Sequence, residues 1–168
     1  TKAITSAAAL MLSEEGKLRI DDPISRHLPE YRQATVWKDG KAVAPDKAPT
    51  IRDLLCHTAG YSYGSTGIPE LDKIHRAAGP LVETESLTNF VKRMAKVPMA
   101  FEPGRGWLYG ISTDLLGAVV ERASGIPLDQ FFLERIFMPL GMHDTGFVIP
   151  EAKRDRMAVV YKSNRRGR

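Results

Sequence analysis

The sequence predicts a mostly helical chain of the α/β (α+β) class. Three observations lead to this prediction. Roughly five segments space their apolar residues as helices do, the β-prone segments are short and scattered, and they are too few to build a full sheet. The length of 168 residues is enough for one domain with its own core.

The first predicted helix covers residues 2–15 and ends at Gly16. Its helically spaced positions are Ala3, Ala7, Leu10, Met11 and Glu14. Residues 19–31 predict an extended segment followed by a short helical turn, because prolines interrupt them twice. The Lys-Asp-Gly-Lys sequence at 38–41 lies between short β-prone pieces and predicts a small hairpin.

Polar residues mark the starts of the next helices. Thr50 is a predicted N-cap for a short helix over 51–57, and residues 58–70 are rich in Gly, Ser and Tyr, which indicates a loop. Ser86 is expected to cap a helix over 87–96 with one apolar face.

Two more helices are predicted near the C-terminal end. Ser112 or Thr113 should cap a helix over 114–124, which Gly125 ends. Pro127 stands where the first residue of a further helix, 127–138, is expected.

Charge and composition exclude several classes of function. Residues 153–168 hold seven basic residues and one acid, which leaves 17 basic and 19 acidic residues elsewhere. This basic tail predicts a solvated chain end and no nucleic-acid partner, because no aromatic residue interleaves its arginines. No apolar stretch is long enough for a membrane span.

Cysteine and histidine give no sign of a metal site or another cofactor. Cys56 is the single cysteine, so no internal disulfide exists, and we expect a small buried residue at a helix end. The four histidines form no metal-binding spacing.

Two residues are candidates for chemistry. Lys2 lies in the first turn of an alanine-rich helix, where the helix dipole and burial both favour a neutral amine that can act as a base. Tyr109 lies in a glycine-flanked turn just before a helix and can present its hydroxyl to a cleft. From the residues alone, a surface lysine and a packed core tyrosine remain the alternatives.

Four stretches resemble the serine β-lactamase-related family, which includes class C β-lactamases, DD-peptidases and esterases. They are residues 1–30, 50–61, 101–125 and 136–147, in the order that the family has them. The resemblance implies the β-lactamase/transpeptidase-like fold. It also implies that residues 1–168 form a partial domain, mostly the helical region, with most of the antiparallel sheet missing.

The resemblance gives both candidates a role. In this family the nucleophile belongs to a Ser-x-x-Lys motif at the start of a buried helix, and Lys2 matches its lysine. The serine is then expected two residues before Thr1, in an absent N-terminal part, and the third family motif in an absent C-terminal part. Tyr109 matches the family's tyrosine, which shares the proton network; which of the two residues is the base stays open.

Three further residues, Ile111, Tyr61 and Tyr63, complete the predicted site. Class C β-lactamases carry Tyr-x-Asn, whereas Ile111 holds the third place here, which favours an ester with an apolar acyl group. Tyr61 and Tyr63 are expected either to line the cleft mouth or to pack at the surface. His57 is assigned a structural role, with its ring bonded to a helix end or loop carbonyl.

The predicted function is a serine hydrolase that forms an acyl-enzyme on a small-molecule ester or β-lactam and needs no cofactor. A carboxylesterase is ranked first, with a β-lactamase and then a D-amino-acid-specific peptidase as alternatives. A non-catalytic scaffold or binding relative is the alternative from another class. The family is bacterial in type, which leaves the cytoplasm and the periplasm both open, and the oligomeric state is undetermined.

Overall fold

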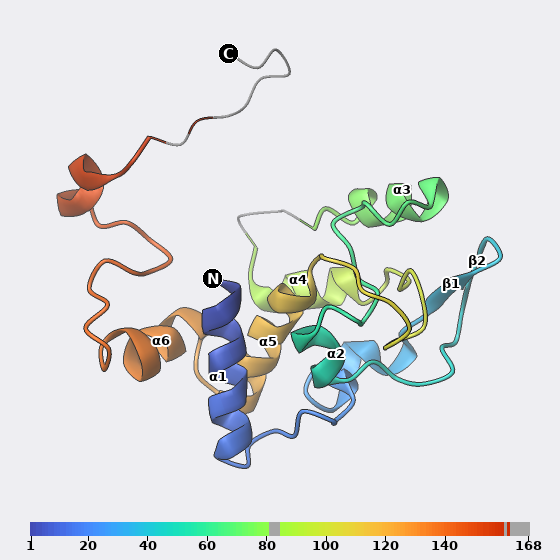
Figure 1. Ribbon diagram of the computed structural model, residues 1–168, viewed down its shortest axis with the longest axis horizontal. Helices are drawn as coiled ribbons and strands as arrows, with labels where there is room; N and C mark the ends of the chain where they lie inside the picture. Colours follow the sequence, from blue (N-terminus) through green and yellow to red (C-terminus); the bar gives the residue numbers. More distant parts are fainter. Residues whose placement is uncertain (81–84, 160, 162–168) are drawn as a thin grey trace.

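Two long helices form the centre of the protein. The computed structural model describes residues 1–80, 85–159 and 161. Helix α1, Lys2–Glu14, lies beside α5, Ser112–Ser124, although the two are far apart in the sequence (Figure 1). The predicted first helix and its end at Gly16, with a φ of 72°, are thereby confirmed.

The residues that α1 buries differ from the helically spaced residues that the sequence analysis named for this helix. Its buried residues are Thr5, Ala8, Ala9 and Leu12, whereas Ala3, Ala7, Leu10 and Glu14 are exposed. Alanines stand on every side of this helix, so the pattern does not fix which side packs. Small residues allow the two helices to approach closely: a Cβ added to Gly117 of α5 would lie 4.0 Å from the Thr5 methyl carbon.

A small hairpin is the one sheet within the described residues. Strand β1, Val36–Lys38, pairs antiparallel with β2, Lys41–Val43, and the two turn residues between them have positive φ angles of 50° and 74°. Positive φ at both positions defines the turn that Asp-Gly favours, so the predicted hairpin is confirmed. On its other side, β1 bonds to Met99, whose carbonyl accepts from the Trp37 N–H at 2.8 Å.

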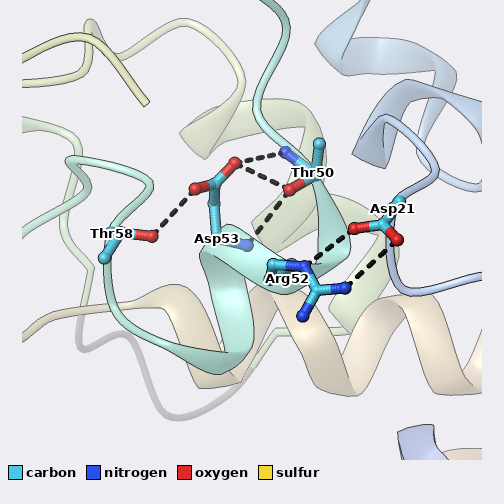
Figure 2. Close-up of polar contacts among 5 residues, drawn as sticks. All are labelled: Asp21, Thr50, Arg52, Asp53 and Thr58. Carbon is cyan, nitrogen blue, oxygen red and sulfur yellow. Dashed lines mark hydrogen bonds and ion pairs between the residues drawn. The ribbon is translucent and has the colours of Figure 1, made fainter. Parts of the chain in front are cut away.

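Helix α2, Ile51–Leu55, begins with the predicted Thr50 cap. The Thr50 hydroxyl accepts from the Asp53 N–H at 3.2 Å, and the Asp53 carboxylate accepts from the Thr50 N–H at 3.0 Å (Figure 2). The same carboxylate accepts from the Thr58 hydroxyl at 2.8 Å. Arg52 donates from two guanidinium nitrogens to the two carboxylate oxygens of Asp21 (Figure 2). This network therefore fixes the turn that follows the helix. Cys56 is exposed there, which corrects its predicted burial.

Helix α3, Pro69–Ala77, was not predicted and replaces the end of the expected loop. It buries only Leu71, Asp72 and His75, so its apolar signal is weak. Helix α4, Leu87–Met94, has the predicted cap, since the Ser86 hydroxyl accepts from the Asn89 N–H at 3.3 Å.

Helices α5 and α6 begin differently from their predicted starts. Ile111 is the N-cap of α5 and makes no side-chain cap bond, while Ser112 and Thr113 lie inside the helix and are buried. Gly125 ends α5 with a φ of 72°, as predicted. Pro127 precedes α6, Leu128–Phe132, instead of being its first residue, and a π-helical turn, Leu133–Phe137, continues it.

Short 3₁₀ turns complete the described chain. They cover Ile24–Arg26, Pro29–Gln33 and Glu151–Arg156, and the last lies well away from the helical centre (Figure 1). Lys153 and Arg156 of the predicted basic tail pair with Asp144 at 2.8 and 2.6 Å, and residues 162–168 lie outside the described part. Among the described helices, none has the length and hydropathy needed to cross a membrane.

Candidate active site

Lys2 and Tyr109 meet at the N-terminal end of α1. The Lys2 Nζ lies 4.8 Å from the centroid of the Tyr109 ring and 5.9 Å from that of Tyr63. Lys2 is half-buried, and the Tyr109 side chain keeps 50% of its surface exposed. An ammonium so placed is attracted to the faces of both rings. The structure thus brings the two predicted catalytic residues together, and their roles stay predictions.

A close backbone contact fixes the turn that presents Tyr109. A Cβ added to Gly110 would stand 2.3 Å from the Tyr61 carbonyl oxygen and 2.6 Å from the Ser62 Cα, so only glycine fits. The Leu108 N–H donates to the His57 carbonyl at 2.9 Å. Tyr109 is therefore held between the loop after α2 and the start of α5.

His57 lies directly against Tyr109. The two rings stack with centroids 5.1 Å apart and planes 25° from parallel. The predicted hydrogen bond from the ring to a helix end or loop carbonyl is wrong for Nδ1, which is buried and has no hydrogen-bond partner among the residues that the structure describes. Burial first, and then the positive charge of Lys2, lower the pKa of His57 below its ordinary value. His57 therefore contacts one predicted catalytic residue, Tyr109, and its pKa responds to the charge of the other, Lys2.

Tyr63 approaches from the loop after α2 and is held by Asp114. Its hydroxyl donates to the Asp114 carboxylate at 2.8 Å, and its ring lies 6.2 Å from the Tyr109 ring. Burial and the neighbouring carboxylate both raise the pKa of Tyr63. Asp114 was not predicted as a site residue; its one signal in the sequence is that it is an acid in the first turn of the helix after Tyr109.

Tyr61 and Ile111 lie elsewhere than predicted. Tyr61 is 1% exposed and packs edge-on against Tyr31, with ring centroids 5.7 Å apart. Ile111 is fully buried in the same core. Neither side chain can contact a ligand in this structure, because both point into the hydrophobic core and are packed there.

Trp107 is a further aromatic residue at the site that the sequence analysis did not select. Its side chain is 67% exposed, with the ring 6.4 Å from Tyr109 and 6.2 Å from His57. Its position two residues before Tyr109 was the available signal, since alternate residues of an extended segment point to one side.

Comparison with known proteins identifies the family. A family model described as beta-lactamase matches residues 1–168. The chain belongs to the beta-lactamase family. Esterase EstB of Burkholderia gladioli is 38% identical over 165 residues, which cover 96% of this chain and 40% of that protein. The lovastatin esterase of Penicillium rubens is 37% identical, with 88% of this chain and 38% of that protein covered.

Solved structures confirm the β-lactamase/transpeptidase-like fold. EstCE1, titled a hydrolase with promiscuous acyltransferase activity, superposes with a TM-score of 0.73 at 35% identity, over 90% of this chain and 39% of that one. A β-lactamase/D-alanine carboxypeptidase from Yersinia pestis gives 0.71 at 21% identity, over 94% and 42%, and shows the fold alone. The chain spans about 40% of the length of these beta-lactamase family relatives.

Proposed function

We propose that this chain is the helical region of a serine hydrolase that cleaves esters through an acyl-enzyme. The main observation in support is that the Lys2 amine lies 4.8 Å from the centroid of the Tyr109 ring, at the N-terminal end of a packed helix. Family membership supports the assignment, since relatives at 35–38% identity include an esterase and a hydrolase by name.

The nucleophile in this proposal is a serine two residues before Thr1. Residues three apart on a helix share a face, so its hydroxyl would lie beside the Lys2 amine. The serine oxygen attacks the ester carbonyl carbon while its proton passes either to Lys2 in its neutral amine form or to Tyr109 in its phenolate form. That proton then goes to the departing alkoxide, and water releases the acid in a second, equivalent cycle. Backbone N–H groups at the helix N-terminus stabilise the oxyanion.

The aromatic side chains around the pair favour an ester with an apolar part. Tyr63, Trp107 and Tyr109 present ring surface next to the amine, and two of the three are at least half exposed. Ile111 adds no contact because it is buried, yet its position also lacks the amide that class C β-lactamases use there. We therefore rank carboxylesterase first, β-lactamase second and D-amino-acid-specific peptidase third.

Activity of the full-length protein tests this ranking. A p-nitrophenyl ester should turn over faster than a chromogenic cephalosporin, and the reverse would put β-lactamase first. Lys2→Ala should slow acylation roughly 10²–10⁴-fold, since it removes a positioned proton-transfer group. Tyr109→Phe should also cause a large loss. Lys41→Ala and Tyr161→Phe, at exposed positions away from the site, are the matched controls.

A non-catalytic relative is the competing proposal. The codon two places before that of Thr1 distinguishes the two, because alanine or glycine there removes the nucleophile and serine keeps it. Near-normal rates in both Lys2→Ala and Tyr109→Phe would instead show that the roles assigned to these residues are wrong.

Acyl transfer is a second candidate reaction. The monacolin J acid methylbutanoyltransferase of Aspergillus terreus is 33% identical over 157 residues. An alcohol that attacks the acyl-enzyme in place of water would give transfer with the same residues. Ester product formed by the full-length protein in the presence of added alcohol would support it, and acid as the sole product would exclude it.

A further inference from the structure

His75 is a buried polar residue that the proposed reaction does not use. It lies on α3 and is fully buried. Its Nδ1 is 3.2 Å from the Ser62 carbonyl oxygen, and its Nε2 is 2.8 Å from the Pro98 carbonyl oxygen. Both ring nitrogens therefore face groups that only accept hydrogen bonds.

A neutral imidazole fits this arrangement poorly. It carries one N–H, so one nitrogen lone pair would face a carbonyl lone pair with no water to intervene, and such unpaired buried contacts are costly. With a proton on each nitrogen, the ring donates to both carbonyls. The two contacts thus point to an imidazolium.

The charged groups around His75 are one carboxylate and two guanidinium groups, each bonded to groups other than the imidazole ring. Asp72 lies one turn earlier on the same face of α3 and accepts from the Thr66 N–H at 2.6 Å and its hydroxyl at 2.8 Å. Arg76 donates to the Gly64 carbonyl at 2.6 Å, and Arg93 of α4 donates to the Ala78 and Gly79 carbonyls. The loop beside the ring contributes the phenols Tyr61 and Tyr63.

One of the two carbonyls belongs to the loop that carries Tyr63, and the other belongs to the extended segment beside the hairpin. Ser62 directly precedes Tyr63, and Gly110 packs on its backbone next to Tyr109. Pro98 directly precedes Met99, whose N–H donates to the Thr35 carbonyl at 2.8 Å. His75 therefore ties the Tyr63 loop to the extended segment beside the hairpin.

We propose that His75 is a positioning residue that donates hydrogen bonds from both ring nitrogens and so fixes the Tyr63 loop. It touches neither Lys2 nor Tyr109 and acts through the backbone of Ser62. The kinetic consequence rests on the proposed function, whereas the state of the ring does not.

Ring nitrogen resonances of the full-length protein, labelled with ¹⁵N-histidine, test the proposal directly. His75→Gln identifies the signal by its loss. We expect two ring N–H groups on His75, both protected from solvent exchange. A ring with one protonated and one bare nitrogen would overturn the proposal, whether or not the protein hydrolyses esters.

Ester kinetics test the positioning role. His75→Phe, which has no donor, should lower kcat at least about 10-fold with little change in KM, because small misplacements of reacting groups are costly. His75→Gln keeps a donor and should recover part of the rate. His143→Gln, at an exposed position, is the matched control and should behave as the parent. Equal rates for His75→Phe and the control would contradict the role.

The two arms separate the two proposals. Suppose that the full-length protein does not hydrolyse esters but shows both His75 ring protons. The proposed function is then refuted, and the proposal that His75 donates two hydrogen bonds still holds. Should His75→Phe fail to fold, the ring resonances of the parent protein still decide the question.

Discussion

His57 occupies a backbone conformation that residues with a side chain seldom adopt. Its φ is 58°, its ring stacks on that of Tyr109, and the positive charge of Lys2 is near enough to lower its pKa. Strain of this kind persists where the surroundings fix it, often next to functional groups. In this protein the Leu108 N–H donates to the His57 carbonyl, and the Tyr109 ring stacks on the imidazole. These two contacts hold His57 in its strained backbone conformation.

We predict that His57 titrates below its ordinary pKa of 6.5, because burial and then the Lys2 charge disfavour the imidazolium. The folded protein then binds this proton more weakly than the unfolded chain. Its contribution to stability is full above the ordinary value and falls as the pH drops below it. An NMR titration of the His57 ring, with His57→Gln for assignment, measures the midpoint.

Charge removal separates the two causes of this shift. Lys2→Met should move the His57 midpoint upward, toward the ordinary value, because the nearby positive charge is gone. Lys17→Met, just beyond the other end of α1, should leave the midpoint unchanged. An unmoved midpoint in Lys2→Met would show that burial alone is responsible.

The resemblance to the serine β-lactamase-related family predicted the meeting of Lys2 and Tyr109, because each matches a residue of a family motif. It did not predict the neighbours His57, Asp114 and Trp107. Each of these side chains reaches the site from a segment whose path depends on tertiary packing. Tyr61 shows the same limit in reverse, since it lies only two residues before Tyr63 and yet is buried in the core, so this loop does not alternate its side chains as a strand would.

The turn before α5 is the element on which the position of Tyr109 depends. We predict that Gly110→Ala destabilises the full-length protein by about 1–3 kcal/mol, because its Cβ would overlap backbone atoms that cannot yield easily. The nearest of those atoms would be 2.3 Å away. Ester turnover should fall as well, since relief of the overlap moves Tyr109 or the Tyr63 loop.

Gly146→Ala is the matched control for that prediction. Its added Cβ would lie 3.7 Å from the Val148 carbonyl oxygen, an ordinary contact. Thermal unfolding of the parent and both variants gives the comparison. Equal melting temperatures for Gly110→Ala and the parent would mean that the Tyr61–Ser62 backbone moves at no cost, against the packing described above.

Helices with a clear cap or a one-sided apolar pattern were predictable, and the others were not. Thr50 and Ser86 cap α2 and α4 as expected, because their side chains bond to backbone within three residues. Helix α3 escaped prediction because polar ties hold it: Asp72, His75 and Arg76 all bond to groups outside the helix. Long-range polar contacts leave no periodic signal in a sequence.

Across the whole molecule, the apolar surface is distributed unevenly. The helical centre buries its apolar side chains, whereas the segment after α6 exposes many of its own. The exposed residues are Leu133, Met138, Leu140, Phe147, Val148, Ile149, Met157 and Val159. Several of them line a cavity of about 520 Å³ between the π-helical turn and the last 3₁₀ turn. Apolar surface gathered in this way binds other apolar groups.

We predict that the chain of residues 1–168, prepared alone, binds a hydrophobic dye and associates as its concentration rises. Val148 and Val159 are 81% and 72% exposed, so Val148→Asp and Val159→Asp together should weaken both effects without loss of helix content. Ala42→Asp, at an exposed hairpin position, adds a like charge away from this surface and should change neither. Dye fluorescence and sedimentation measure the two effects. If the paired variant and the control bind dye equally, the apolar surface lies in the helical centre instead, and the packing of α1 against α5 is looser than the structure indicates.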